Sequence, residues 1–421
     1  MIPGANTLRI PAFRNLFIGQ SISLLGDSLY YLVIFYMAGK AANNADWAVG
    51  LVGAAQALPF LLSGPFGGQM ADRMDRRKIM LWADLLSAII TGILAITAIW
   101  YPIPNIWVIG ATGFLLSTVN SVFMPARSAA IPRLVPEDEL MSANGLIMTT
   151  QQLVQMAGIA VSAFALGAIE KIAPNLFLTL AAGLNALTFL GSAYYIYLLP
   201  AIVPKKEEVE EQHILRDIGD GLKAVWKNPF TQVVLPVALL FQLSISGFFV
   251  IYVSVNVKWF GGHYSNLAWI EFSFMVVLAV TSVLMGLFKI RKVGWSYAIA
   301  IIGIGVLVGI MGLWKNYWIF LILNALCGLF VPFAWLPVTT YLQSAFPDNL
   351  RGRVSSVFNM VHGSMQPVSM AVVGPLITGV GITNVFYLMG IGMTAAGVGA
   401  LFFPGFREAE LTEDSAQTSQ Q

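Results

Sequence analysis

Three acidic residues lie inside long apolar stretches of the sequence, and this position marks them as candidates for chemistry. They are Asp27, Asp84 and Glu271. A charge at the centre of a bilayer costs at least about 2.5–3.5 kcal/mol on insertion scales, so each carboxyl must face protein or water. Removal from water favours the neutral acid, and such a group can take up a proton on one side of a membrane and release it on the other. The sequence therefore marks these three residues as functional candidates by their position alone.

Asp27 is the strongest of these candidates. It lies about 14 residues into its apolar run, or roughly 21 Å along a helix. Gln20, Ser23, Asp27 and Tyr30 follow the spacing i, i+3, i+7 and i+10, so a helix places them on one face. We expect this face to line a central cavity. The alternative is that Asp27 is a satisfied polar group that bonds to a neighbouring helix.

The other two carboxyls lie closer to the ends of their runs. Glu271 is a few residues into its run, which suits a second protonation site, an outer gate, or an interfacial residue that pairs with Lys258. Asp84 follows Lys78 by six residues, and we expect it near the opposite surface, as part of a charged latch rather than a substrate site.

Uncharged polar residues form two further helical patches. The clearer one has spacings of 4, 3, 4 and 3 and consists of Ser355, Asn359, His362, Gln366 and Ser369. This stripe suits cavity lining or hydrogen bonding between helices. His362 titrates near physiological pH if unperturbed, although a lone histidine is more often structural. Gln151 and Gln155 form a comparable patch, offset by 211 residues from His362 and Gln366.

The elements that carry these residues are membrane-spanning helices. The 421 residues are 57% hydrophobic and only 10% charged, with a mean hydropathy of +0.75, whereas soluble proteins carry roughly 25% charged residues. Backbone groups in lipid must be satisfied within the segment, so apolar runs of about 20 residues predict helices. Twelve such runs occur, at 13–39, 47–70, 79–100, 105–124, 142–169, 174–199, 231–257, 267–288, 295–314, 317–344, 354–379 and 384–403. The predicted fold class is an all-α integral membrane protein with twelve transmembrane helices in two six-helix bundles.

The basic residues predict the orientation of these helices. Of the 23 Lys and Arg residues, the four that fall on one side of the alternating spans are Lys40, Lys171, Lys258 and Lys315. All the others fall on the opposite side, which the positive-inside rule makes cytoplasmic. Both termini and the long middle loop are therefore predicted to be cytoplasmic.

The long polar loop divides the chain. We expect an N-terminal six-helix bundle over 1–200, a cytoplasmic linker over 201–230, a C-terminal six-helix bundle over 231–404 and a cytoplasmic tail over 405–421. Within the linker, Ile214, Ile218, Leu222 and Val225 share one face, which suits an amphipathic helix on the membrane surface. A solvated linker is the alternative for the charge run before it.

A charged motif follows the second apolar run and reads Gly68-Gln69-Met70-Ala71-Asp72-Arg73-Met74-Asp75-Arg76-Arg77-Lys78. It resembles the loop 2–3 signature of the major facilitator superfamily, in which Gly, three residues, Asp-Arg and two residues precede a basic pair. The resemblance implies a cytoplasmic gate, an ion-pair latch that stabilises the outward-facing state. Its residues would be Gly68, Asp72, Arg73, Arg76 and Arg77, with Asp84 beside them.

Further stretches are similar to the macrolide-efflux type of drug:proton antiporter. They include Leu25-Gly26-Asp27, Leu134-Val135-Pro136-Glu137 and Gly352-Arg353-Val354. The resemblance implies a bacterial cytoplasmic (inner) membrane transporter that exports amphiphilic drug-like molecules in exchange for protons, with Asp27, Glu271 and His362 as coupling candidates. The chain departs from many drug antiporters in two ways: span four offers only Ser117, Thr118 and Asn120 instead of an arginine, and span five has no Gly-Pro motif.

Other classes fit the sequence poorly. No phosphate-binding Gly-rich motif occurs, and three His and one Cys are too scattered for a metal site, so we expect no cofactor, no metal and no enzyme activity. The expected partners are a small amphiphilic substrate, protons and the lipid bilayer, with no nucleic acid, and the expected state is a monomer. The remaining alternative is a lipid or lysophospholipid flippase, or a siderophore or metabolite facilitator, without proton antiport.

Overall fold

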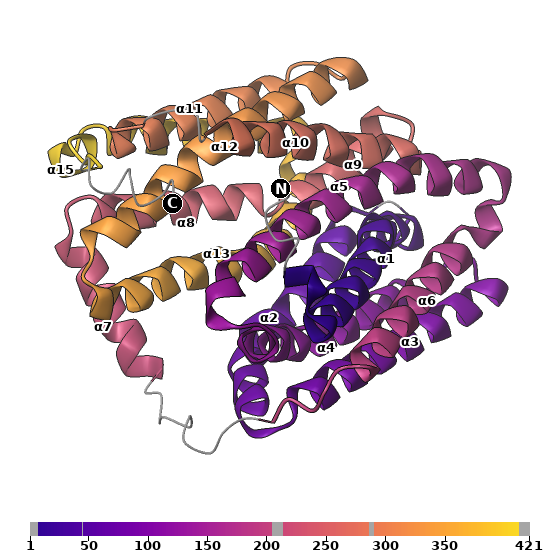
Figure 1. Ribbon diagram of the computed structural model, residues 1–421. Coiled ribbons are helices and arrows are strands. Elements are labelled where there is room, and N and C mark those ends of the chain that lie inside the picture. Colours follow the sequence, from indigo (N-terminus) through magenta and orange to yellow (C-terminus); the bar gives the residue numbers. More distant parts are fainter. Residues whose placement is uncertain (1–6, 44, 204–213, 286–289, 412–421) are drawn as a thin grey trace. The chain divides into compact units, whose positions relative to one another are not determined.

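The structure is a computed structural model that describes residues 7–43, 45–203, 214–285 and 290–411. Within these ranges, the side chains of residues 61–69, 72, 214–217, 348, 349 and 362 are left undescribed. The described part is almost entirely helical and contains no β-strand, only an isolated bridge between Lys292 and Glu410. Its α-helices (Figure 1) are α1 Pro11–Ala41, α2 Asp46–Arg73, α3 Arg76–Trp100, α4 Ile106–Leu134, α5 Leu140–Ile172, α6 Phe177–Tyr197, α7 Ile214–Lys227, α8 Thr231–Ile245, α9 Phe248–Trp259, α10 Tyr264–Leu284, α11 Val293–Met311, α12 Tyr317–Ala345, α13 Asp348–Val380, α14 Ile382–Ala400 and α15 Pro404–Arg407.

These helices account for every predicted span. Ten helical segments of the described residues are long and apolar enough to cross a bilayer. The helices α2 and α13, at 28 and 33 residues, also exceed the length of about 20 residues that a bilayer requires. The predicted all-α membrane fold with twelve spans is therefore confirmed.

Side-chain caps define several helix starts. The Asn105 side chain accepts a hydrogen bond from the Trp107 backbone N–H at 3.0 Å at the start of α4. The Asn316 side chain accepts from Trp318 and Ile319 at 3.0 and 3.1 Å at the start of α12. Both satisfy backbone donors that the first turn of a helix leaves free.

The seventh span is interrupted, although the sequence predicts one continuous helix over 231–257. It consists of α8 and α9, which meet at Ser246 and Gly247. A Cβ atom at Gly247 would lie 2.7 Å from the Ser369 hydroxyl oxygen of α13, so only glycine allows this approach. The same Ser369 hydroxyl donates to the Leu243 carbonyl in the last turn of α8.

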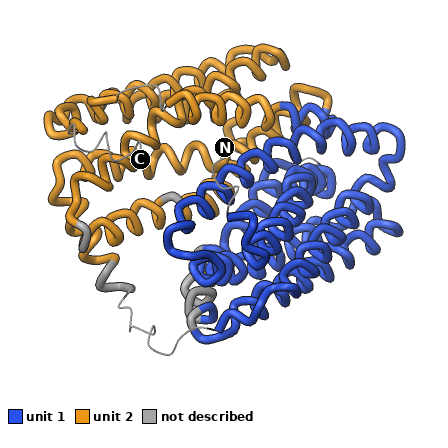
Figure 2. The backbone as a smooth tube through the Cα atoms, viewed as in Figure 1, with its two compact units in different colours: residues 1–210, 262–269 blue, residues 211–261, 270–421 orange. Residues whose placement is uncertain are grey.

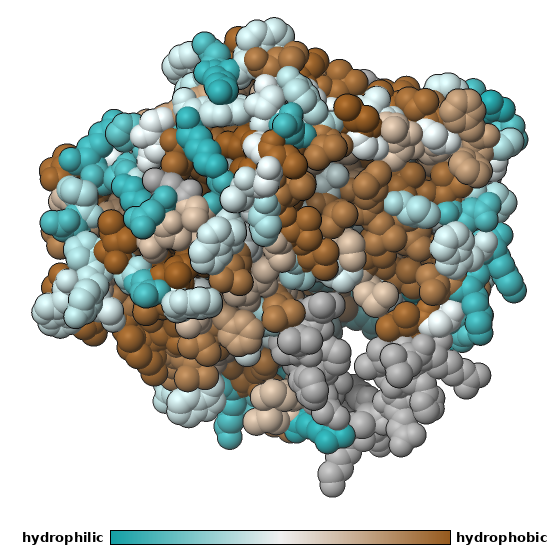
Figure 3. Space-filling view, turned by 180° about the vertical axis from the view of Figure 1, so that it is seen from behind, coloured by the Kyte–Doolittle hydropathy of each residue, from teal (hydrophilic) through white to brown (hydrophobic). Residues whose placement is uncertain are grey.

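The outer helices have one apolar face exposed and one face packed. On α3, Trp82, Leu86, Ile89, Ile93 and Ile96 are all 46–63% exposed and recur every three or four residues. Figure 3 shows brown hydrophobic side chains exposed over a broad part of the molecular surface. Such a surface requires lipid as its solvent, because a protein in water would not expose so large an apolar area.

Helix α1 is mostly buried, unlike the outer helices. In its most apolar window 72% of the residues are buried, against 22–50% in the other nine segments. It packs against α2, α4, α5 and α6. Polar residues on α1 therefore face protein rather than lipid.

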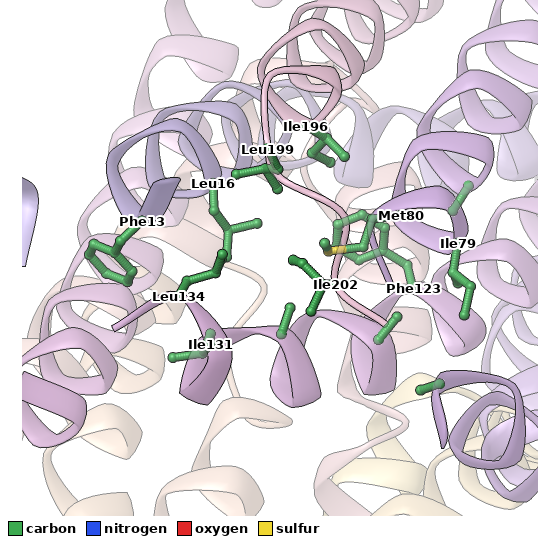
Figure 4. Packing of buried hydrophobic residues seen from close by; sticks show 14 of the residues in the cluster. Phe13, Leu16, Ile79, Met80, Phe123, Ile131, Leu134, Ile196, Leu199 and Ile202 are labelled. Atoms are coloured by element: carbon green, nitrogen blue, oxygen red, sulfur yellow. The ribbon is translucent and has the colours of Figure 1, made fainter. Parts of the chain in front are cut away.

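The chain forms two compact units (Figure 2). Unit 1 contains residues 1–210 and 262–269, and unit 2 contains residues 211–261 and 270–421. Residues 262–269 follow α9 in the sequence yet belong to unit 1, so α10 begins in unit 1 and continues into unit 2. A hydrophobic cluster lies in unit 1, where Phe13, Leu16, Met80, Phe123 and Ile196 bring α1, α3, α4 and α6 together (Figure 4).

Helix α7 packs against α13 within unit 2. Val225 is fully buried, and a Cβ atom at Gly221 would lie 2.5 Å from the Arg353 carbonyl oxygen. Asp220 of α7 forms an ion pair with Arg353 at 3.2 Å. Part of the apolar face that the sequence assigns to a membrane surface therefore packs against protein, while Leu222 and Trp226 stay exposed.

Candidate functional site

Asp27 lies at the interface of α1 and α6 in unit 1. Its Oδ1 atom accepts a hydrogen bond from the Asn185 side-chain amide of α6 at 3.5 Å. The Asn185 oxygen in turn accepts from the Thr188 hydroxyl at 3.2 Å, which fixes the orientation of the amide. The described residues provide no cation within ion-pairing distance of Asp27, so no protein charge neutralises its carboxylate there.

Gly26 makes this contact between the helices close. A Cβ atom there would come within 2.6 Å of the Asn185 side-chain oxygen and within 2.8 Å of the Thr188 Cβ atom. A side chain at this position would displace the amide that holds Asp27. The Gly26-Asp27 pair thus combines a small residue for packing with a carboxyl for chemistry.

Asp84 is buried within unit 1. It is in the third turn of α3, on the side opposite the exposed apolar face, and only 3% of its surface is exposed. One of its carboxylate oxygens is buried without a hydrogen-bond partner among the described residues. The helix α3 packs mainly against α6 and α4, so Asp84 faces the interior of unit 1, and its place in a cytoplasmic latch stays a prediction.

Arg127 forms a polar cluster with two glutamines. Its Nη1 atom donates to the Gln20 side-chain oxygen at 3.2 Å. With the Gln151 amide oriented so that its oxygen faces the guanidinium group, that oxygen accepts from Nη1 and Nη2 at 2.8 and 3.2 Å. The Nε atom is buried without a partner, and no acidic side chain among the described residues pairs with Arg127. The helices α1, α4 and α5 therefore hold a positive charge that the described residues leave unneutralised.

The loop 2–3 motif is anchored within unit 1. Asp75 accepts from the backbone N–H groups of Arg77 at 3.1 Å and Ile202 at 2.9 Å, and so caps α3. Arg76, which is 5% exposed, donates to the carbonyl groups of Ala71 at 3.1 Å and Ala129 at 3.2 Å.

Arg77 donates to the Tyr197 carbonyl at 2.5 Å and lies over the Tyr197 ring. These contacts of both arginines are thus with carbonyl oxygens and a ring of unit 1. Arg73 is exposed at the end of α2. The side chains of Gly68 and Asp72 lie outside the described residues, so the latch stays a prediction.

The other predicted residues lie in several environments. Ser23 and Tyr30 are buried at 7% and 4% exposure, and the Tyr30 hydroxyl has no partner among the described residues. Gln155 on α5 and Glu271 on α10 are partly buried. Asn359 and Gln366 are exposed on α13, while the side chain of His362 lies outside the described residues.

A second polar cluster lies at the far ends of α1 and α5 from the loop 2–3 motif. We call it the clasp, and it consists of Tyr36, Lys40, Ser162, Glu170 and Tyr264. Glu170 accepts from the Tyr264 backbone N–H at 2.9 Å and from the Tyr36 hydroxyl, and it lies 3.5 Å from the Lys40 ammonium. The Tyr264 hydroxyl bonds to Ser162.

The clasp holds residues 262–269 in unit 1. The rings of Tyr36, Phe177 and Tyr264 meet edge to face with centroids 5.0–5.7 Å apart, and all three are at most 2% exposed. Such aromatic contacts add about 0.5–1.5 kcal/mol each beyond area burial. A segment that follows α9 in the sequence is therefore firmly attached to helices of the first half.

The arrangement of these polar groups suits the movement of ions and solutes. Among the described residues, no group of three His, Cys, Asp or Glu side chains could hold a metal ion. The groups around Asp27, Asp84 and Arg127 are carboxyls, amides, hydroxyls and a guanidinium inside membrane helices. Intramembrane groups of this kind mark substrate and ion pathways.

The comparisons with known proteins agree with this picture. The family model described as Major Facilitator Superfamily matches residues 16–264 and 238–420. Macrolide efflux protein A of Streptococcus pyogenes is 25% identical over 382 residues, covering 90% of this chain and 92% of that protein. Multidrug efflux pump Tap of Mycolicibacterium fortuitum is 25% identical over 387 residues, covering 88% and 90%.

Solved structures share the fold at low identity. The nucleoside transporter NupG aligns with a TM-score of 0.66 at 12% identity and covers 93% of this chain and 98% of its own. A POT family transporter in complex with 5-aminolevulinic acid aligns with a TM-score of 0.67 at 15% identity and covers 94% and 96%. The fold is thus that of multi-pass membrane transporters, and the chain belongs to the Major Facilitator Superfamily.

The sequence prediction misses three features of the site. The first is Arg127, which falls in a loop if span four ends at Met124, whereas α4 continues to Leu134 with Pro125 and Pro132 inside it. The prediction that span four offers no arginine is therefore wrong for the helix as a whole, because α4 contains Arg127. Because prolines are tolerated in membrane helices, Pro125 and Pro132 do not require the helix to end before Arg127.

The other two features are Glu170 and the polar residues of α6. Glu170 lies one residue beyond the predicted end of span five, whereas α5 continues to Ile172. Asn185 and Ser192 are not among the predicted residues, although their spacing of seven places two polar side chains on one face of an apolar helix.

Proposed function

We propose that this protein exports amphiphilic drug-like compounds across the bacterial cytoplasmic membrane in exchange for protons. The observation that carries the proposal is Asp27, a carboxyl on the most buried of the ten apolar segments compared above, bonded to Asn185 and without a cation partner among the described residues. A carboxyl in such a place binds a proton readily, and a local change in its surroundings releases it. The names of the relatives, a macrolide efflux protein and a multidrug efflux pump, support export as the direction.

The proposed cycle uses alternating access. Protonation of Asp27 removes a negative charge from unit 1, and a bound cationic or polar substrate competes for the same carboxyl. Gln20, Ser23, Tyr30, Gln151, Gln155, Asn359 and Gln366 remain proposed cavity-lining residues, and Glu271 and His362 remain proposed coupling residues. Gly68, Asp72, Arg73, Arg76 and Arg77 remain the proposed cytoplasmic gate.

We propose that the clasp is a second gate, at the membrane side opposite the cytoplasmic gate. The far ends of α1 and α5 carry it, so its opening would release residues 262–269 from the first-half helices. The proposal also includes cytoplasmic termini, a six-plus-six division with a linker over 201–230, and a monomeric state.

One observation favours a second candidate. Arg127 has no acidic partner among the described residues, and a partly buried guanidinium group binds carboxylates and phosphates strongly. A flippase or facilitator that moves a lysophospholipid, siderophore or other anionic metabolite without proton exchange would use such a charge.

Transport in everted vesicles separates the two candidates. The proposed function predicts that vesicles containing the protein accumulate a fluorescent amphiphilic dye when a proton gradient is imposed, and lose it when an uncoupler is added. Uptake that is unaffected by the uncoupler would favour the second candidate, and a lysophospholipid probe that equilibrates between leaflets would identify it.

A further inference from the structure

A stripe of polar side chains on α6 connects the surroundings of Asp27 to those of Asp84. The polar stripe consists of Asn185, Thr188 and Ser192, spaced by three and four residues on the packed face of a helix whose other face carries exposed leucines. Asn185 and Ser192 are 1% and 0% exposed. From Asn185 to Ser192 the helix advances about 10 Å.

The packing of neighbouring helices fixes what lies at each end. Gly26 of α1 approaches Asn185 and Thr188, so Asp27 lies at the first end. Helix α3 runs alongside α6, since a Cβ atom at Gly183 of α6 would lie 3.8 Å from the Ala95 side chain of α3. Eleven residues before Ala95, Asp84 lies beside Ser192, and it is close enough to Asp27 for an electrostatic interaction.

Two buried atoms at the Asp84 end make no hydrogen bond of normal distance and angle among the described residues. They are one carboxylate oxygen of Asp84 and the hydroxyl oxygen of Ser192. An unpaired carboxylate oxygen in an apolar interior is costly, whereas a protonated carboxyl can donate its O–H to a nearby hydroxyl. Two carboxylates that share one interior also disfavour simultaneous ionisation.

From this geometry we propose that Asp84 is a second proton-binding residue of the transport cycle, linked to Asp27 through the polar stripe of α6. The inference rests on the proposed proton-coupled export and deepens it. Asp84 binds a proton from one aqueous side as its O–H bond forms, and the proton returns to water on the other side as that bond breaks. Proton binding by Asp84 would take place inside the protein, because Asp84 lies on the buried face of α3.

The test compares Asp84→Asn with Thr91→Val in the full chain. Asparagine keeps the size and the hydrogen-bonding capacity of the site but cannot carry a proton. Thr91 is a matched control, since it is a fully buried polar residue of α3 whose hydroxyl donates to carbonyl groups of its own helix. Both variants are measured in vesicles for dye accumulation driven by a proton gradient and for gradient-independent dye counterflow.

We expect Asp84→Asn to reduce gradient-driven accumulation to less than about a tenth of the wild-type value while counterflow stays within about twofold, because only proton binding is lost. Thr91→Val should preserve both activities, and Asp84→Glu should restore part of the driven transport. An Asp84→Asn protein with wild-type driven accumulation would overturn the inference. So would an Asp84→Asn protein that inserts and folds normally but loses counterflow to the same extent as driven transport.

The two proposals fail in different ways. If wild-type protein moves dye without regard to the gradient, the proposed function fails. If wild-type protein depends on the gradient and Asp27→Asn abolishes that dependence while Asp84→Asn does not, the second proton-binding residue fails alone.

Discussion

Loss of the Glu170 carboxylate should open the clasp. Glu170 is 9% exposed and accepts hydrogen bonds from the Tyr264 backbone N–H and the Tyr36 hydroxyl. A hydrogen bond to a charged group contributes about 1.5–3 kcal/mol, so Glu170→Ala should shift the equilibrium towards the open clasp by at least about 3 kcal/mol. That free energy corresponds to roughly a 100-fold increase in the open population.

Lys40 provides the matched comparison. Its side chain is 38% exposed, and its contacts are the ion pair with Glu170 at 3.5 Å and the Tyr36 ring at 4.8 Å. Exposed ion pairs contribute about 0–1 kcal/mol, so Lys40→Ala should increase the open population by about fivefold at most. The two substitutions remove partners of the same salt bridge, yet their expected effects differ by more than tenfold.

Thiol labelling measures the open population. Cys327 is the only cysteine in the sequence, so Cys327→Ser gives a background without thiols. Ala268→Cys then places a small reporter at a position that is 0% exposed in the segment that the clasp holds. Equal labelling rates in the Glu170→Ala and Lys40→Ala backgrounds would refute the assignment of the clasp as a gate.

Two further predictions concern packing in unit 1. A disulfide between Gly167→Cys and Ser265→Cys should stop transport until it is reduced, because it would tie the segment held by the clasp to α5. A Cβ atom at Gly167 would lie 3.0 Å from the Ser265 Cβ, so a separation of about 0.5 Å more brings the pair into the disulfide range. Gly26→Ala should lower the stability in detergent by about 1–3 kcal/mol and impair transport, because the added methyl displaces Asn185 and Thr188. Gly92→Ala, where nothing lies within 4 Å, should leave thermal unfolding unchanged.

A second disulfide serves as the control for the first. Gly183→Cys with Ala95→Cys joins α6 to α3, and a Cβ atom at Gly183 would lie 3.8 Å from the Ala95 Cβ. Both helices belong to the first half of the chain, so this bond should leave transport intact. If both disulfides block transport equally, the effect is not specific to the clasp.

The spans can be predicted from the sequence because one physical requirement dominates them. Backbone groups in lipid must be satisfied within a helix, and about 20 apolar residues are needed to cross. Hydropathy alone therefore locates all twelve spans. It cannot locate the break between α8 and α9, which depends on the approach of Gly247 to Ser369 in a distant helix.

The environments of the polar residues are harder to predict. The distance of Asp84 from Lys78 suggests a surface position, yet the periodicity of the exposed apolar residues on α3 places it on the packed face. The partners of Asp27 and Arg127 come from other helices of unit 1, and a single sequence contains no information on which helices are neighbours. Hydropathy also ends a span at the first charge, which is why Arg127 and Glu170 fall outside the predicted spans.

In the proposed cycle, Asp27 carries the protons that drive export. The most direct test of this role is proton movement in proteoliposomes that contain a pH-sensitive dye and purified protein, after addition of an amphiphilic substrate. We expect substrate-dependent proton flux with the wild-type protein and no flux with Asp27→Asn. Thr112→Val is a control that should keep the flux, because its buried hydroxyl donates to the Val108 carbonyl of its own helix. Equal proton flux in the wild-type and Asp27→Asn proteins would contradict this role of Asp27.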